Sequence, residues 1–447
     1  MTSKPIVLIL LLSIGMFSCT NDQMPTLVEL DMELRSLVEQ ASPEKSWEYY
    51  VLPDENDLAS IPQDPHNPLT KAKVELGKML YFDTGLAMDA KKESGKGTYS
   101  CATCHVPEAG FKPNNFQGIA DGGVAYGVAG EKRAMNTEYK ESEIDVQSAR
   151  PLTMVNVAFV KNTMWNGSFG AGHVNEGTEE RWNDESGTAR NHMGMSGMET
   201  QNIDGLIVHR IRIEKTLLDQ LGYTKMFDEA FPEIPESERY TLLTGSFALS
   251  AYIRSILSTR APFQRWLKGD LSALSYQEKK GAILFFGKAN CANCHFEPNL
   301  GSHEFHALGV KDMYQTLSYN AKPTDKRNLG RGGFTKRDED MFKFKVPGLY
   351  NVGDTHFYFH GASKRSLEDV IKYKALAQSE NPEVPQERIS TKLVPVTLTS
   401  EEVSYLVSFL DKSLRDPDLL RYKPTHVLSG NCFPNNDRQS RIDAGCN

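Results

Sequence analysis

The sequence predicts a mainly α-helical protein of two similar domains that pack around a shared interface. Its 447 residues are roughly two to three times the length of a typical single domain. An internal repeat supports this division, because the pattern glycine-x-x-leucine-aromatic-phenylalanine occurs at 77–82 and again at 281–286. Apolar residues at helical spacing surround both copies, whereas strand signals are few.

Capping patterns mark where several helices begin. Ser275 with Glu278, and Thr399 with Glu402, have the spacing of a capping box, in which each side chain binds the backbone N–H of the other residue. Ser366 begins a further helix in a similar way. In chain order, the expected helices are 74–82, 242–257, 276–286, 367 onwards and 400–414.

The N-terminus has the pattern of a bacterial export signal. An apolar run at 6–17 follows Lys4 and is short for a bilayer-spanning helix. Cys19, preceded by Ser18, resembles the cleavage site of a lipoprotein, and simple secretion is the alternative. We expect residues 1–19 to be a lipoprotein-like signal peptide and the mature chain to lie in the periplasm, attached to the membrane only by lipid.

Four of the seven cysteines form two copies of the pattern Cys-x-x-Cys-His. Two thiols at this spacing reach the two vinyl groups of one haem, and the next residue places an imidazole beneath the iron. The motifs therefore predict two covalently bound haem c groups. Their residues are Cys101, Cys104 and His105, and Cys291, Cys294 and His295.

Zinc is the alternative for paired Cys-x-x-Cys motifs. A zinc site needs no histidine directly after each pair, and the two pairs lie far apart in the chain, so haem is favoured. We expect two cytochrome-c-like haem domains, at 20–260 and 261–447. Cys432 and Cys446 remain, and we expect them to form a disulfide, because disulfides persist in exported proteins.

Further segments resemble the bacterial diheme cytochrome c peroxidase family, which includes the methylamine-utilisation diheme enzymes. Residues 67–70 resemble the family's approach to its first helix, and 156–167 resembles its Asn-Val-Ala-Phe and Phe-Trp-Asp-Gly steps. Residues 344–352 resemble Phe-Lys-Thr-Pro-x-Leu-Arg-Asn-Val, and 358–368 resembles Tyr-x-His-Asp-Gly followed by Ser-Leu-Glu. The resemblance covers roughly residues 50–435, in the same order.

The resemblance implies a division of labour between the two haems. The N-terminal haem meets hydrogen peroxide, whereas the C-terminal haem accepts electrons from a small donor, such as a cytochrome c or a blue-copper protein (a cupredoxin). Two electrons and two protons then convert one peroxide into two waters.

One departure from the family concerns the N-terminal haem. In many members a histidine in the loop after the first motif is the sixth ligand of this haem until reduction releases it. The corresponding step here is 118–121, Gly-Ile-Ala-Asp, and no histidine lies between His105 and His173. The resemblance thus implies an open N-terminal haem that needs no reductive activation, unless His173 or His192 reaches in.

Cleavage of the peroxide O–O bond needs a group that moves a proton between the two oxygens. The family uses a distal glutamate, and Glu199 is the residue whose surroundings fit it best. The alternative is a solvated carboxylate at a helix start. Trp165 is expected near the haems, where it either assists electron transfer or serves only in packing.

Two further ligand positions stay open. The family supplies Met or Tyr as the sixth ligand of the C-terminal haem, and counting along from His360 places Lys374 there, with Tyr373 beside it. Family members also hold a calcium ion between the haems. Thr355 matches a threonine of that site, but 150–153 lacks its asparagine.

The leading interpretation is a diheme cytochrome c peroxidase. One alternative is a protein-modifying oxidase that stores oxidising equivalents on both haems, which a tyrosine ligand would favour. Another is a non-catalytic diheme electron carrier, which an open haem argues against. The formal net charge of −8 gives no basic footprint for nucleic acid. Homodimers are common in the family, and the oligomeric state of this chain is left open.

Overall fold

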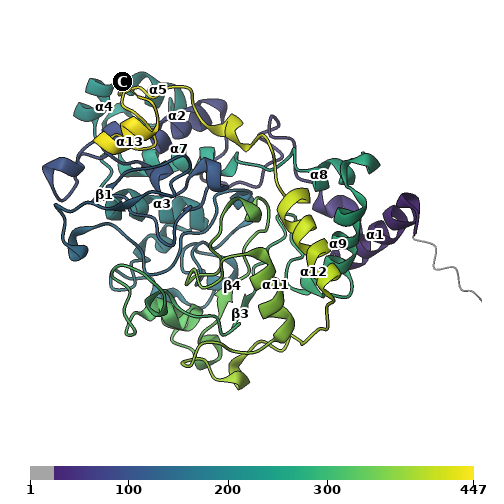
Figure 1. The fold of residues 1–447 in the computed structure, drawn as a ribbon. Coiled ribbons are helices and arrows are strands. Elements are labelled where there is room, and N and C mark those ends of the chain that lie inside the picture. The colour runs from purple at the N-terminus through teal and green to yellow at the C-terminus, as the bar shows by residue number, and fades with distance from the viewer. Residues whose placement is uncertain (1–24, 447) are drawn as a thin grey trace, which may run out of the picture.

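The computed structural model describes residues 25–446, and α-helices are its main elements (Figure 1). Strands form two antiparallel pairs, β1 with β2 and β3 with β4. Within the described residues, no helix has both the length and the apolar character needed to cross a membrane. The helices are α1 (Leu27–Ala41), α2 (Lys71–Phe82), α3 (Gly197–Val208), α4 (Lys215–Leu221), α5 (Thr224–Ala230), α6 (Glu236–Arg239), α7 (Leu242–Arg254), α8 (Pro262–Leu267), α9 (Tyr276–Phe286), α10 (Arg331–Thr335), α11 (Leu367–Leu376), α12 (Ser400–Ser408) and α13 (Arg438–Asp443). The strands are β1 (Gly123–Val124), β2 (Ala134–Met135), β3 (Phe305–His306) and β4 (Phe344–Lys345).

The mainly α-helical fold is confirmed, and so are the predicted helix starts, except that the helix expected from residue 74 begins at Lys71. Ser275 and Thr399 cap α9 and α12 with complete capping boxes, and Ser366 caps α11. The predicted helix ends are less accurate. α7 ends before residue 257, and α12 gives way to a π-helical turn before residue 414.

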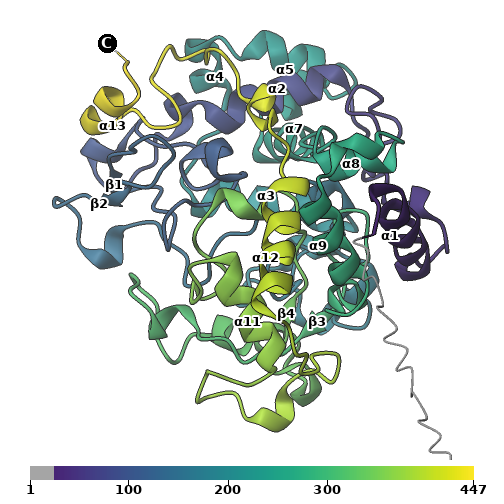
Figure 2. The same ribbon diagram turned by 45° about the vertical axis from the view of Figure 1, so that its right-hand side comes forward.

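The internal repeat corresponds to a pair of closely packed helices in each half of the chain. α2 packs on α7 in the first half, and α9 packs on α12 in the second (Figure 2). A Cβ atom on Gly77 would lie 1.9 Å from the Ala248 carbonyl oxygen, and one on Gly281 would lie 2.0 Å from that of Tyr405. The glycine of the repeat is therefore required where the two helix backbones touch.

The two ends of the chain cross over between the halves. α1 packs on α9, where Asp31 accepts hydrogen bonds from Trp266 Nε1 at 2.8 Å and Lys279 Nζ at 2.7 Å. The C-terminal segment returns to the first half, and α13 lies beside β1 (Figure 1). Both chain ends thus pack across the boundary between the predicted segments 20–260 and 261–447.

The returning C-terminal segment holds the loop of the first Cys-x-x-Cys-His motif. The hydroxyls of Ser100 and Thr103 donate to the Pro434 carbonyl at 3.0 and 3.1 Å. The predicted disulfide between Cys432 and Cys446 is confirmed, and it closes this segment. The segment therefore acts as a covalently closed strap over the first motif.

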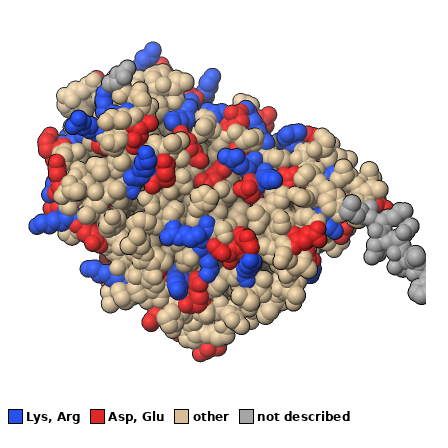
Figure 3. Space-filling view, viewed as in Figure 1, with Lys and Arg blue, Asp and Glu red and all other residues tan. Residues whose placement is uncertain are grey.

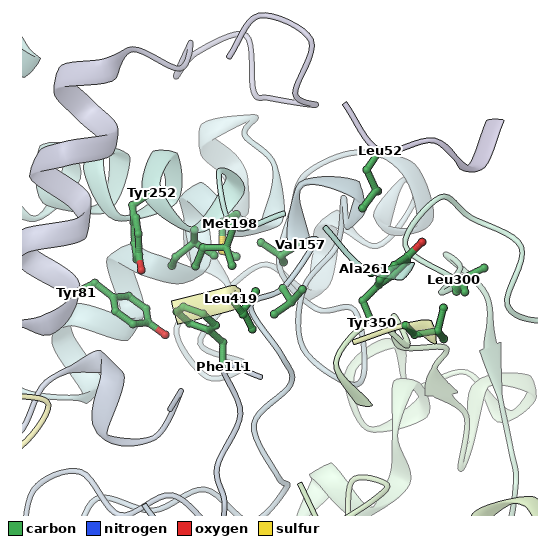
Figure 4. Packing of buried hydrophobic residues seen from close by; sticks show 14 of the residues in the cluster. Leu52, Tyr81, Phe111, Val157, Met198, Tyr252, Ala261, Leu300, Tyr350 and Leu419 are labelled. Carbon is green, nitrogen blue, oxygen red and sulfur yellow. The ribbon is translucent and has the colours of Figure 1, made fainter. Parts of the chain in front are cut away.

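One continuous cluster of buried apolar side chains runs through both halves of the molecule. Tyr81, Phe111 and Tyr252 lie together in the first half, whereas Leu300 and Tyr350 lie in the second (Figure 4). On the outside, acidic and basic side chains are interspersed over the face shown in Figure 3. The two halves therefore share one core.

A buried ion pair joins α3 to α7. Glu199 is fully buried, and its two carboxylate oxygens accept hydrogen bonds from Arg254 Nε at 3.0 Å and Nη2 at 2.6 Å. Asn67 Nδ2 lies 3.4 Å from the same carboxylate. Breaking such a pair from one side leaves a buried charge without a counterion, which costs more than the pair itself contributes.

We therefore expect Arg254→Ala to lower the free energy of unfolding by about 3–5 kcal/mol, because it leaves the buried Glu199 carboxylate without a counterion. Urea denaturation followed by circular dichroism measures this change. Arg265→Ala is the matched control, because Arg265 pairs with Asp270 at the exposed surface, and it should leave stability nearly unchanged. Equal effects of the two substitutions would contradict the structural role of the α3–α7 pair.

Candidate haem centres

The first Cys-x-x-Cys-His motif opens onto a cavity of about 440 Å³. Cys101, Cys104 and His105 line it from one side, and α3 lines it from another. The His105 ring donates from Nδ1 to the Phe111 carbonyl at 3.4 Å. Burial lowers the pKa of His105 to about 4, which keeps the imidazole neutral. A neutral histidine held at one nitrogen by a carbonyl is the form in which the other nitrogen ligates a metal.

The second motif repeats this geometry around a smaller cavity of about 230 Å³. Cys291, Cys294 and His295 line it. The His295 ring donates from Nδ1 to the Leu300 carbonyl at 2.7 Å, and burial lowers its pKa to about 3. Both motifs thus present two thiols and a neutral imidazole to a largely apolar cavity.

Three features of the cavity walls fit haem. Lys345 Nζ and Arg150 Nε are buried and have no hydrogen-bond partner among the described residues. Burial lowers the pKa of Lys345 to about 7, so a nearby anion would stabilise its charge; the propionates of haem are such anions. Gly118 packs against Cys104, where a Cβ atom would lie 2.6 Å from the sulfur. A thioether at Cys104 therefore requires glycine at this position.

The two cavities share a wall. Residues 150–153, Trp165 and 344–348 line both. Trp165 Nε1 donates to the Arg150 carbonyl at 2.6 Å, and the Lys345 N–H donates to the Trp165 carbonyl at 2.8 Å. The Trp165 indole also lies edge-on to His360, with ring centroids 6.1 Å apart. The structure thus places Trp165 between the two sites.

Glu199 does not line the first cavity, which corrects its assignment as the distal acid. On a helix, residues 198, 202, 205 and 209 share one face, and 199 points away from it. The α3 side chains that do line the cavity include Gln201, Asn202 and Asp204. α3 starts at Gly197. The position of each residue around this helix decides which side chains line the cavity, and it places Glu199 on another side.

The histidines considered as ligands of the first haem also lie outside its cavity. His173 packs on His303 with ring centroids 4.4 Å apart, and His192 Nε2 contacts the Trp182 carbonyl at 2.8 Å. His209, which the sequence analysis missed, does line the cavity. Its Nδ1 lies 2.7 Å from an Asp145 carboxylate oxygen.

His209 carries a perturbed pKa. Burial alone would lower the pKa of His209, but the Asp145 carboxylate raises it above its ordinary value. His209 is therefore paired with Asp145 at the cavity wall, and its Nδ1 atom is committed to that carboxylate.

The structure distinguishes between Lys374 and Tyr373 as candidate ligands of the second haem. Lys374 lines the second cavity. Tyr373 does not, because its hydroxyl donates to the Leu308 carbonyl at 2.6 Å and its ring packs against Phe359. Of the two candidates, only Lys374 faces the place that a haem would occupy.

His306 also lines the second cavity, but its position argues against ligation of iron. Its two ring nitrogens contact Glu304 and Ser390, each at 2.9 Å. Donor atoms of His306, Glu304 and Cys294 all lie within 4.8 Å of one another. His306 therefore stands at the sulfur-bearing edge of the haem site, away from its centre.

The calcium site implied by the family resemblance does not fit this structure. Arg150 Nη2 donates to Thr355 Oγ1 at 2.8 Å and also contacts the Pro113 carbonyl. A guanidinium already supplies positive charge at Thr355, and it would repel a divalent cation. We therefore assign no calcium to Thr355.

Comparisons with known proteins agree with the two-haem geometry. The family profile of the di-haem cytochrome c peroxidases matches residues 71–272. The cytochrome-c peroxidase IdrP1 of Denitromonas iodatirespirans is 26% identical over 383 residues, which are 80% of this chain and 86% of that protein. The methylamine utilization protein MauG of Methylorubrum extorquens is 28% identical over 362 residues, which are 80% of this chain and 82% of that protein.

Solved structures show the same fold. A MauG-like protein associated with microbial copper homeostasis superposes with a TM-score of 0.58 at 23% identity, covering 83% of this chain and 96% of that one. The diheme peroxidase BthA of Burkholderia thailandensis superposes with a TM-score of 0.52 at 16% identity, covering 83% of this chain and 91% of that one. With two Cys-x-x-Cys-His motifs, two cavities and one shared wall, the chain resembles the di-haem cytochrome c peroxidases in sequence and in fold.

Proposed function

We propose that this protein reduces hydrogen peroxide to water at the N-terminal haem, with electrons that enter through the C-terminal haem. The observation that carries this proposal is the shared wall, which sets two haem cavities of different size on either side of Trp165. The N-terminal cavity is the larger of the two. Haem iron, when bound, supplies the peroxide-binding and electron-transfer chemistry.

The side chains of this protein hold and orient the reacting groups. Arg150 and Lys345 provide buried positive charge at both cavities, where haem propionates would neutralise it. The Arg150 carbonyl fixes the indole of Trp165 through its N–H. Trp165 thereby keeps one orientation in the wall, and we propose that it assists electron transfer between the haems.

The electron donor in this proposal is a small periplasmic protein, such as a cytochrome c or a cupredoxin. Lys392 and Val394 line the second cavity, and Val394 is 50% exposed, so this cavity reaches the surface there. A donor that docks over this rim would come close to the C-terminal haem. Cys19 lies outside the described residues, and the lipid anchor and periplasmic location remain proposals from the sequence.

The alternative functions receive less support. A tyrosine ligand would favour a protein-modifying oxidase, but Tyr373 is held outside the second cavity by the Leu308 carbonyl. A passive electron carrier would keep a sixth protein ligand on its first haem, yet neither His173 nor His192 lines the first cavity. We therefore place peroxide reduction first.

Stopped-flow absorbance tests the proposed reaction. Fully reduced protein mixed with one equivalent of hydrogen peroxide should lose two electrons rapidly, one from each haem, because the shared wall couples the two sites. Absent or slow oxidation would contradict peroxide reduction and favour the electron carrier. Oxidation of the N-terminal haem alone would contradict coupling through the wall.

We further propose that Lys374 is the sixth ligand of the C-terminal haem. No hydrogen bond or ion pair is formed by its amine within residues 25–446, and it faces the cavity of His295. Electron paramagnetic resonance of the ferric protein should show a low-spin signal that Lys374→Ala converts to high spin. Lys374→Met should introduce the sulfur-to-iron charge-transfer band of Met/His haem.

Tyr373→Phe is the matched control for this assignment. It removes the neighbouring hydroxyl, which donates to Leu308, and it should leave the low-spin signal unchanged. Loss of that signal in Tyr373→Phe, or its survival in Lys374→Ala, would overturn ligation by Lys374.

A further inference from the structure

Two buried cationic side chains lie beside the wall that the two cavities share. Arg150 is 4% exposed, and Lys112 is 7% exposed. Both line the second cavity, and Arg150 also lines the first. Burial, together with the charge of Arg150, lowers the pKa of Lys112 to about 7. The two cationic groups therefore act on each other through the protein interior.

Neutral oxygen atoms hold these two side chains. Arg150 Nη2 donates to Thr355 Oγ1 at 2.8 Å and to the Pro113 carbonyl. The Thr355 hydroxyl in turn lies 3.3 Å from the Pro113 carbonyl oxygen, so two oxygens meet at one nitrogen. Lys112 Nζ donates to the Asn351 carbonyl at 2.9 Å. Uncharged oxygens of this kind are among the ligands of hard metal ions such as calcium.

Acidic side chains do not neutralise this pair of cations. Within residues 25–446, no carboxylate forms an ion pair with Arg150 or Lys112. Asp354 acts on Lys112 through its charge alone, and its carboxylate is paired with Arg415 at 2.6 Å. A buried guanidinium normally has a carboxylate partner, because desolvation of an unpaired charge is costly. The surroundings of Arg150 thus resemble those of a bound metal ion more than those of an ordinary ion pair.

We propose that the Arg150 guanidinium, supported by Lys112, takes the place of the calcium ion that the family resemblance implies between the haems. Its Nη2 atom binds the hydroxyl of Thr355, the residue that matches a threonine of the calcium site. Arg150 also begins the segment 150–153, where the asparagine of that site is missing. A cation that is part of the chain fills the position, so the wall does not depend on a divalent metal.

The same residue connects this cation to the rest of the wall. The Arg150 N–H binds the His360 carbonyl at 2.8 Å, and the Arg150 carbonyl accepts from Trp165 Nε1 at 2.6 Å. Its guanidinium meanwhile joins Pro113 to Thr355. Arg150 is therefore a positioning residue for Trp165. The inference concerns the cation in the wall and does not depend on peroxide reduction.

The first test measures the calcium response of the haem-loaded wild type. After exposure to calcium and gel filtration, elemental analysis should find no calcium retained in proportion to protein. The thermal midpoint should be the same in calcium chloride and in the chelator EGTA. One retained calcium per chain, or a midpoint that falls in EGTA, would overturn the proposal.

The second test attempts to restore the calcium site. The double variant Arg150→Asn with Lys112→Met removes both cations and supplies an amide oxygen near Thr355. Calcium at about a hundredfold its Kd should then raise the thermal midpoint by about 3 °C, because a ligand that binds only the folded state stabilises it. A merely structural role of Arg150 would lower the midpoint without making it depend on calcium.

Arg365→Asn is the matched control. Arg365 contacts the same aromatic ring as Arg150, that of Phe357, with its guanidinium carbon 4.2 Å from the ring centroid, but it is exposed. It should give no calcium response. A folded double variant that ignores calcium, or a control that responds equally, would overturn the replacement of calcium by Arg150. If the double variant does not fold, the wild-type measurements alone decide the proposal.

Discussion

The wall between the two haem cavities is the constraint on which the rest of the structure depends. It consists of residues 150–153, Trp165 and 344–348, which come from two regions distant in sequence, and short hydrogen bonds join them. The Arg150 carbonyl holds the Trp165 indole, the Arg150 N–H binds the His360 carbonyl at 2.8 Å, and the Lys345 N–H binds the Trp165 carbonyl. In the proposed function the cysteines would attach each haem to its own half, so this wall would determine how the two haems lie relative to each other. Electron transfer across it needs that geometry to be rigid.

The same close contact between two helices occurs in both halves. Gly77 and Gly281 let two helix backbones touch in each half, which brings the helix before each motif into a fixed position. The chain ends then tie the halves together, since α1 packs on α9 and the segment closed by Cys432 and Cys446 covers the first motif. A core that runs through both halves leaves the wall little freedom to open.

Local patterns in the sequence predicted the parts of the structure that depend on local chemistry. The haem motifs, the repeat, the helix starts and the disulfide each follow from spacing or from elimination among few residues. The side chains that line the two cavities could not be predicted in this way. Whether Glu199 lines the first cavity depends on which side of α3 meets it, and the choice between Tyr373 and Lys374 depends on which side of α11 meets the second cavity. Calcium at Thr355 was left open by the sequence, and the contact that argues against it, between Arg150 and Thr355, joins segments whose proximity no spacing reveals.

The most direct test of the account is a crystal structure of the haem-loaded protein. The account predicts one haem in each cavity, with the Trp165 indole between the two rings and its N–H still bound to the Arg150 carbonyl. The propionates should lie beside Lys345 and Arg150, whose buried nitrogens have no partner among the described residues. A haem that lies outside its cavity, or a Trp165 side chain displaced from the wall, would contradict the claim that this wall couples the two sites.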